Sequence, residues 1–234
     1  MKNIKLIAFD ADDTLWVNEP YYRETEHKFA ALLSEYIPEK ECIEKLFEIE
    51  MQNLELYGYG AKSFALSMIE TALKISDYKI SGKAIEKIID YAAELNKKVI
   101  DILPGAENVL SELQNTDCKI VLATKGDLLD QERKLKKSEL EKYFHHIEIM
   151  SKKTENDYLK LLKHCDTKPE NFLMAGNSLK SDILPVLKIG GTAVYIPFHT
   201  TWIHEEIEKE NFTNFKKYYR LKNIGELLKL IDNE

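Results

Sequence analysis

Short apolar runs that end abruptly in polar turns constrain the fold of this chain more than any other feature of its sequence. The runs lie at residues 4–9, 119–123, 147–150, 172–175 and 192–196. Each has the length of a strand, and several contain β-branched residues. Four of the five end in clusters of polar side chains that look functional. These runs predict buried strands whose carboxyl ends carry polar groups.

Helical patterns separate the later runs, at residues 107–113, 128–137, 154–163 and 179–188. The third opens with the capping signature Thr154-x-x-Asp157, and the fourth ends at Gly190-Gly191. Strands that alternate with helices indicate a parallel sheet covered on both faces. We therefore expect an α/β fold with a Rossmann-like parallel sheet, which binds ligands at the carboxyl ends of its strands.

Residues 19–101 have a different pattern. They contain no convincing strand, and their apolar residues recur at helical spacing, as in Ile85, Ile88, Ile89 and Ala92. Turn-forming residues mark both borders. We predict three to five helices that form an inserted all-helical cap domain at residues 19–101. Residues 1–18 and 102–234 then form the α/β core domain.

Length and charge limit the possible functions. A chain of 234 residues is long enough for one α/β domain and a smaller insertion. The net charge of −7 disfavours general binding to nucleic acid or to anionic membranes. No apolar run is long enough to span a bilayer, and the start lacks a signal-peptide core. Three scattered cysteines fit a reducing compartment. We expect a cytoplasmic protein, and the sequence leaves its oligomeric state open.

Four polar motifs follow strand-like runs in order along the chain. They are Asp10-Ala11-Asp12-Asp13-Thr14, Thr124-Lys125, Lys152-Lys153 and Gly176-Asn177-Ser178-x-x-x-Asp182. Carboxylates gathered at one edge of a sheet would be costly without a cation. Mg²⁺ prefers such hard oxygen ligands. The motifs therefore indicate a magnesium site that handles an anionic substrate.

These motifs resemble those of the haloacid dehalogenase-like (HAD) hydrolases. The D-x-D-x-T at Asp10 resembles motif I, Thr124 motif II, a lysine at 152 or 153 motif III, and the Gly176 segment motif IV. The resemblance covers nearly the whole chain, and residues 19–101 lie where this family inserts its helical C1 cap. It implies a magnesium-dependent phosphatase acting on a small phosphorylated metabolite.

The resemblance also implies roles for the first motif. Asp10 would attack phosphorus and form a covalent phospho-aspartate. Asp12 would protonate the leaving oxygen and then deprotonate the hydrolytic water. Two residues apart on an extended segment, the two side chains point to the same side. Asp13 occupies a position that is often glycine in this family, and aspartate tolerates such backbone angles.

The other motifs would complete the site. The metal would be held by Asp10, the backbone carbonyl of Asp12, Asn177 and Asp182. Motif IV usually begins with aspartate, so Asn177 removes one negative charge and leaves Asp182 as the acid of that motif.

Thr124 would hydrogen-bond the transferring phosphoryl group, and the motif III lysine would balance charge. Of the two lysines we prefer Lys153, because it directly precedes the capping residue Thr154; Lys152 would be its solvated neighbour. Lys125 and Trp16 are candidate substrate contacts. Lys125 could equally be a solvated charge, and Trp16 could instead pack at a hinge.

Several alternatives remain open at this stage. A phosphomutase would pass the phosphoryl group to a sugar rather than to water. A haloacid dehalogenase typically lacks the second aspartate of motif I. A receiver-like domain carries its phosphorylated aspartate on a later strand, and a non-catalytic binding protein is favoured only by Asn177. His199 and His204 lack the spacing of a zinc protease, because no second histidine follows His204-Glu205-Glu206 in register, and we expect structural or surface roles for all six histidines.

Overall fold

The computed structural model describes residues 3–200, 202, 205, 212 and 215–232. Within these residues a six-stranded sheet has the order β3-β2-β1-β4-β5-β6, and every neighbouring pair is parallel. The strands are β1 (Leu6–Phe9), β2 (Lys119–Lys125), β3 (His146–Met150), β4 (Phe172–Gly176), β5 (Thr192–Tyr195) and β6 (Tyr218–Arg220). The predicted α/β, Rossmann-like sheet is confirmed.

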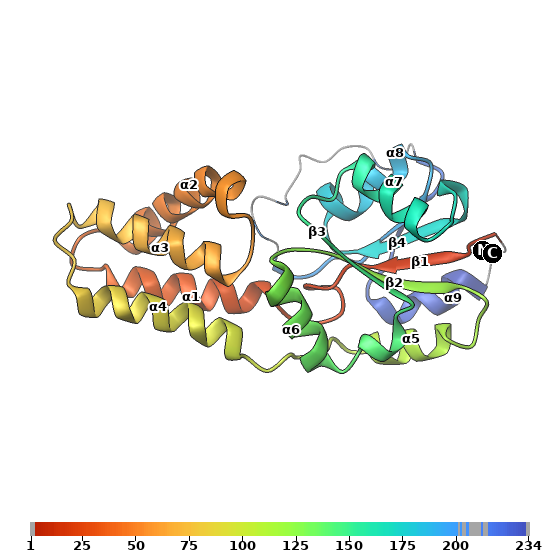
Figure 1. Cartoon of the computed structure of the whole chain (residues 1–234), viewed down its shortest axis with the longest axis horizontal. Helices are drawn as coiled ribbons and strands as arrows, with labels where there is room; N and C mark the ends of the chain where they lie inside the picture. Colours follow the sequence, from red (N-terminus) through yellow and green to blue (C-terminus); the bar gives the residue numbers. More distant parts are fainter. Residues whose placement is uncertain (1–2, 201, 203–204, 206–211, 213–214, 233–234) are drawn as a thin grey trace. The chain divides into compact units, whose positions relative to one another are not determined.

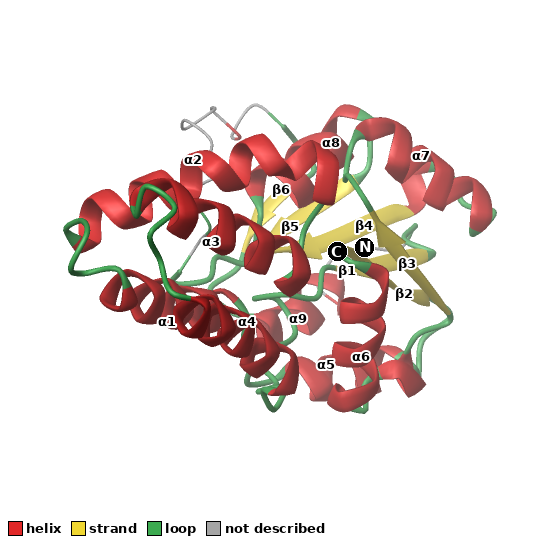
Figure 2. Cartoon of the chain, turned by 60° about the vertical axis from the view of Figure 1, so that its left-hand side comes forward, coloured by secondary structure: helices red, strands yellow, loops and turns green. Residues whose placement is uncertain are grey.

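Helices cover both faces of this sheet (Figure 1). They are α5 (Ala106–Leu113), α6 (Leu128–Ser138), α7 (Glu155–His164), α8 (Leu184–Lys188) and α9 (Leu227–Asp232). Alternate residues of β1 point to opposite faces. Leu6 and Ala8 join the core under α7 and α8, whereas Ile7 and Phe9 join the core that contains α5 and α9. Figure 2 shows the yellow strands between these two helical layers.

Two local predictions change in the structure. We expected one helix over residues 179–188, but a π-helical turn, η3 (Leu179–Ile183), precedes the short α8. Pro185 lies at the start of α8, where a missing N–H is tolerated. Residues 218–220, where we predicted no strand, form the edge strand β6. Short 3₁₀ turns occur at η1 (Glu141–Tyr143), η2 (Pro169–Asn171) and η6 (Ile224–Glu226).

The chain divides into two compact units. One comprises Met1–Glu19, Ile100–Lys125 and Gln131–Glu234, and the other comprises Pro20–Val99 with Gly126–Asp130. All of residues 19–101 are described, and they form four helices and no strand. These are α1 (Glu19–Leu32), α2 (Glu39–Tyr57), α3 (Ala61–Ile75) and α4 (Gly82–Lys97).

The helical unit has a core of its own. Phe29, Leu46, Met68 and Ile88, one from each helix, are at most 1% exposed and pack into one cluster. Ser81 caps α4 by accepting a hydrogen bond from the Ala84 amide. A separate buried core is what allows an insertion to fold as a domain. Across the part of the chain that the structure describes, no helix is both long and apolar enough to cross a membrane.

Candidate active site

Asp10 follows β1 directly, at the centre of the sheet. Its amide donates a hydrogen bond to the Ala175 carbonyl at 2.9 Å, which extends the pairing with β4 by one residue. The chain then turns tightly, because the Leu15 amide donates to the Ala11 carbonyl and the Asp13 amide to the Trp16 carbonyl. This turn places the first two acidic side chains of the motif at the carboxyl edge of the strands.

Asp13 stabilises the turn. Its φ of 61° is left-handed, as the frequent occurrence of glycine at this motif position implies. Its buried carboxylate accepts the amides of Asn18 at 2.8 Å and Glu19 at 3.0 Å. Glu19 begins α1, so Asp13 supplies an acceptor to the orphan donors at a helix start. Burial raises the pKa of Asp13 to about 7.

Lys153 joins two buried carboxylates. Its Nζ lies 2.5 Å from Asp10 Oδ1 and 2.6 Å from Asp182 Oδ1, and its side chain is only 2% exposed. Lys152, by contrast, is exposed. Thr154 and Asp157 form the expected capping box at the start of α7, which fixes the backbone directly after Lys153. The geometry therefore favours Lys153 as the motif III lysine.

The electrostatics of this cluster follow from its burial. Desolvation raises the pKa of Asp10 to about 7, and the nearby carboxylate of Asp182 adds to this effect, although Lys153 opposes it. Burial alone would lower the pKa of Lys153, but the charges of Asp10 and Asp182 raise it well above its usual value. With two carboxylates and one ammonium, the cluster carries an excess of negative charge that suits a cation.

Motif IV holds Asp182 through a tight turn after β4. The Ser178 amide donates to Asp182 Oδ2 at 2.9 Å, and the Ser178 hydroxyl accepts from the Ser181 amide. At Gly176 an added Cβ would lie 2.3 Å from Asp182 Oδ2, so no side chain fits there. The glycine of the motif is therefore required by the position of the acid six residues later.

Asn177 brings a third group to the same point. One end of its side-chain amide lies 3.2 Å from Asp10 Oδ2, the Asp12 carbonyl oxygen and Thr14 Oγ1. If the amide nitrogen faces these atoms, it donates hydrogen bonds to them. If the amide oxygen faces them, Asn177 donates no hydrogen bond to these atoms, and its oxygen joins theirs at the same point. Neighbouring ligands of octahedral Mg²⁺ lie about 2.9 Å apart. Asn177 lies close enough to Asp10 and to the Asp12 carbonyl to share a magnesium ion with them when its amide oxygen faces this point.

Thr124 lies near the end of β2, beside the central strand. Its hydroxyl oxygen is buried and has no hydrogen-bond partner among the residues that the structure describes. Lys125 follows it and donates to Ser181 Oγ at 3.1 Å. Lys125 also pairs with Glu205, whose carboxylate accepts the hydroxyls of Ser178 and Ser181 at 2.5 Å. Burial would raise the pKa of Glu205, but the charge of Lys125 and these hydrogen bonds lower it to about 2.

Asp12 has a different environment from Asp10. Its carboxylate accepts hydrogen bonds from Trp16 Nε1 at 2.7 Å and Gln131 Nε2 at 2.8 Å. Lys134 Nζ lies 3.0 Å from both of its oxygens. The side chain remains 22% exposed, so solvent can reach it. Asp12 is therefore held by donors from the motif I loop and from α6, away from the Lys153 ammonium.

Comparison with known proteins identifies the family. The sequence model of the haloacid dehalogenase-like hydrolases matches residues 4–190. A crystal structure of a haloacid dehalogenase-like family hydrolase from Xanthomonas campestris is 33% identical in sequence, with a TM-score of 0.87. The match covers 99% of this chain and 91% of that one. The chain belongs to the haloacid dehalogenase-like hydrolases.

Two further relatives are more distant. A glyceraldehyde 3-phosphate phosphatase from Pyrococcus furiosus is 24% identical over 250 residues, which cover all of this chain and 95% of that protein. The structure of a HAD phosphatase from Thermococcus onnurineus shares the fold, at 21% identity, a TM-score of 0.67 and 99% coverage of both chains. The prediction of a HAD-like hydrolase is confirmed, and the chain is an enzyme of this family.

The structure brings most of the predicted site residues of this HAD hydrolase together. Contacts join Asp10 to Lys153 and Thr14, Lys153 to Asp182, and the Asn177 amide to the motif I loop. Thr124 and Lys125 lie at the same carboxyl edge. The catalytic and metal-binding roles of these residues remain predictions. The positions of the residues in the structure favour these roles.

Two roles were open for Trp16, contact with a substrate and packing at a hinge. Its side chain has no exposed surface, and its indole nitrogen donates to Asp12. Isolated bridges connect its backbone to Asp12 and to Ile102. A ring without exposed surface is poorly placed to touch a substrate. The geometry instead favours the packing role, in which Trp16 orients Asp12.

Sequence reasoning missed the other groups around the site. Gln131 and Lys134 lie on one face of α6, three residues apart, and both reach Asp12. Glu205 lies in a segment for which we predicted neither a strand nor a helix. The amphipathic pattern of residues 128–137 predicts the helix that carries Gln131 and Lys134. The sequence does not indicate which carboxylate these two side chains contact.

Proposed function

We propose that this HAD hydrolase is a magnesium-dependent phosphatase that acts on a small phosphorylated metabolite through a phospho-aspartate at Asp10. The observation that carries the proposal is the convergence of Asp10, Lys153 and Asp182 at the sheet edge that also carries Thr124, whose buried hydroxyl has no partner among the described residues. An ammonium and a hydroxyl next to a nucleophilic carboxylate are the groups that a transferring phosphoryl needs.

The reaction has two displacements. In the first, a carboxylate oxygen of Asp10 bonds to phosphorus while the ester P–O bond breaks, and Asp12 gives its proton to the leaving alcohol. In the second, water attacks the phospho-aspartate, Asp12 takes a proton from that water, and phosphate leaves. Thr124 and Lys153 donate to the phosphoryl oxygens throughout. The contacts of Trp16, Gln131 and Lys134 with Asp12 are all donations, so they suit the base form that activates water.

Magnesium would be held by Asp10, Asp182, the Asp12 carbonyl and Asn177. Bound there, it would neutralise phosphoryl charge and so let the anionic substrate approach an anionic nucleophile. The spacing of 3.2 Å between the Asn177 amide and its oxygen neighbours supports this assignment. Because Asn177 is neutral, we expect modest affinity for the metal.

We assign the role of cap domain to the helical unit, on the basis of its insertion between β1 and β2 and its separate core. The name of the Pyrococcus relative places glyceraldehyde 3-phosphate first among the phosphorylated metabolites to be tested. An acidic chain with a buried catalytic cluster fits a small substrate better than a nucleic acid. We also retain a cytoplasmic location as a proposal.

The experiment is hydrolysis of p-nitrophenyl phosphate and of a panel of phosphorylated metabolites, with and without magnesium. Wild type should release phosphate only with the metal, and Asp10→Asn should lose at least about 10⁴-fold in kcat. Asp12→Asn should lose about 10²–10⁴-fold while a phosphate analogue still binds. Appreciable magnesium-dependent turnover in Asp10→Asn would contradict the covalent mechanism. An isomerised product without phosphate release would indicate a mutase instead.

The metal assignment has its own test, the magnesium concentration that gives half the maximal rate. Asn177→Asp should lower this concentration, because it adds one negative charge to the ligand set. Asp182→Asn should nearly abolish the magnesium-dependent rate. An unchanged magnesium response in Asn177→Asp, together with a fully active Asp182→Asn, would place the metal elsewhere.

A further inference from the structure

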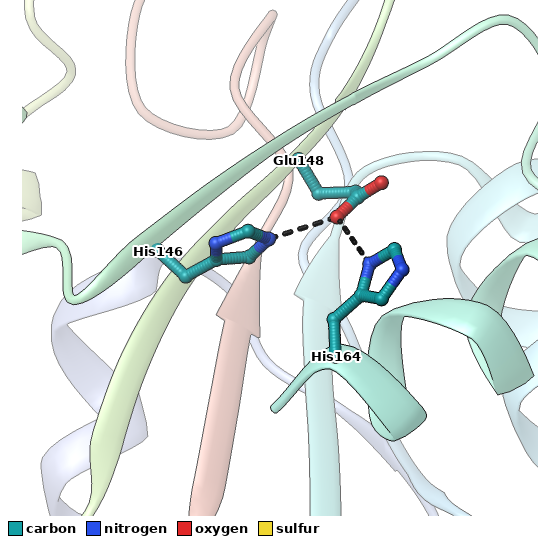
Figure 3. Close-up of side chains that lie close together, drawn as sticks. All are labelled: His146, Glu148 and His164. Carbon is teal, nitrogen blue, oxygen red and sulfur yellow. Dashed lines mark hydrogen bonds and ion pairs between the residues drawn. The ribbon is translucent and has the colours of Figure 1, made fainter. Parts of the chain in front are cut away.

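A second group of ligand-type side chains lies away from the active site, between β3 and α7. His146 is the first residue of β3, and Glu148 lies two residues later, so both side chains point to the same face of this edge strand. His164 is the last residue of α7. Figure 3 shows the two imidazole rings turned toward the carboxylate from opposite sides. Side chains from two successive elements, 16 residues apart in sequence, therefore meet at one point.

The three ligand atoms of this group lie close enough together to converge on one metal ion. His146 Nε2 lies 2.8 Å from Glu148 Oε2, and His164 Nδ1 lies 3.3 Å from the same oxygen. One ligand atom from each residue lies within 4.8 Å of the others. Ligand atoms around tetrahedral Zn²⁺ are about 3.3 Å apart. Small rotations of partly exposed rings would thus bring all three atoms to bonding distance.

The chemistry of the donors selects the kind of metal. Imidazole is a borderline ligand, and a set of two imidazoles with one carboxylate favours Zn²⁺ or a similar transition metal over Mg²⁺, which prefers oxygen ligands alone. The Oε2 atom of Glu148 already lies at the point where the two imidazole rings meet, within hydrogen-bond distance of both. The side chains are 41%, 25% and 56% exposed in chain order, which leaves room for water as a further ligand.

We propose that His146, Glu148 and His164 form a binding site for a transition-metal dication of the zinc type. The site is separate from the magnesium site, since it lies at the start of β3, whereas Lys153 follows the end of that strand. Four residues of β3 span roughly 13 Å. A metal here would join β3 to α7 and would stabilise the segment that carries Lys153.

The test is a titration of the untagged, full-length protein with Zn²⁺ in excess Mg²⁺, which fills the oxygen-ligand site. We expect wild type to bind one Zn²⁺ by calorimetry and to show the absorption bands of four-coordinate Co²⁺. His146→Asn, Glu148→Gln and His164→Asn should each weaken binding at least about tenfold. Zn²⁺ should raise the melting temperature of wild type and not that of these variants, because it binds only the folded site.

A matched control is available in the helical unit. His27 Nδ1 lies 2.5 Å from Glu39 Oε1, a histidine–carboxylate contact that the group of three ligands does not include. His27→Gln should leave Zn²⁺ binding unchanged. No heat of Zn²⁺ binding in wild type would overturn the proposal. So would equal affinity in wild type and the three ligand variants, which would place the ion at the carboxylates or thiols elsewhere.

Discussion

Two polar clusters lie at opposite ends of the β3–α7 unit, and they differ in burial. Lys153, Asp10 and Asp182 meet past the end of β3 with side chains that are at most 10% exposed. At the start of β3, His146 and His164 contact Glu148 while remaining about half-exposed. Both clusters combine acids with nitrogen-containing side chains. Water screens the second cluster and is nearly absent from the first.

This difference in burial determines how much stability is lost when one residue of a cluster is replaced. Removing one partner from a buried ion pair leaves an uncompensated charge that water cannot solvate. Removing one partner from a half-exposed pair costs little, because solvent replaces the lost contact. Substitutions in the buried cluster should therefore cost much stability, and substitutions in the histidine cluster should cost little. Free energies of unfolding, measured by urea denaturation, test this contrast.

The largest effect is expected for Lys153→Met. The substitution leaves Asp10 and Asp182 buried without their cation, and should cost about 3–5 kcal/mol at neutral pH. Stability should recover as the pH falls and the carboxylates take up protons, and also when magnesium is added. Lys152→Met, at the exposed neighbour, is the control and should change stability by less than about 0.5 kcal/mol. Equal losses in both variants would contradict the assignment of Lys153.

Glu205→Gln tests the ion pair between Glu205 and Lys125 at the carboxyl edge of the sheet. The folded pKa of Glu205, about 2, lies below its usual 4.5. A lowered acid pKa contributes stability above pH 4.5, and this contribution is lost as the pH falls from 4.5 toward 2. Glu205→Gln should therefore cost about 2–3 kcal/mol at neutral pH and flatten stability over that window. A control, Glu44→Gln at an exposed carboxylate, should keep the slope of wild type.

Gly176→Ala tests the packing that positions Asp182. The new Cβ would overlap the Asp182 carboxyl group, with 2.3 Å to Oδ2. We expect a loss of about 1–3 kcal/mol, the usual cost of overpacking, and weaker magnesium dependence of turnover. Gly82→Ala is the matched control, because its Cβ would meet nothing within 4 Å. It should be neutral or slightly stabilising. Unaltered stability in Gly176→Ala would show that the motif IV turn can relax.

The smallest effect is expected for His164→Asn in the absence of zinc. Its contact with Glu148 is 3.3 Å long and the histidine is 56% exposed, so the loss should be below about 1 kcal/mol. His27→Gln should behave similarly. A loss of several kcal/mol from His164→Asn would mean that the histidine cluster contributes as much to stability as the buried cluster. It would contradict the expected difference between the two clusters.

The sequence predicted much of the core domain. Periodicity and turn residues located five strands, and the sixth, Tyr218–Arg220, was missed because it is short and reads as a charged, aromatic loop. A strand at the edge of a sheet needs no long apolar run, since only one neighbour covers it. The break of the predicted helix at residues 179–188 was missed because Pro185 also fits the first turn of a helix.

The sequence by itself determined which residues could carry the chemistry. Asp10, Thr124, Lys153 and Asp182 each follow or end a strand, and parallel strands must bring their carboxyl ends to one edge. Spacing along the chain is sufficient for this inference, because strand direction is fixed by the alternation with helices.

Only the tertiary structure decided how those residues are paired. It separates Asp10, buried beside Lys153, from Asp12, which Trp16 and Lys134 hold in a partly exposed position. It also brings His164 to Glu148, a contact that no spacing in the sequence reveals. Burial and contact between distant segments arise from packing, and local pattern does not encode which side chains packing will bring together.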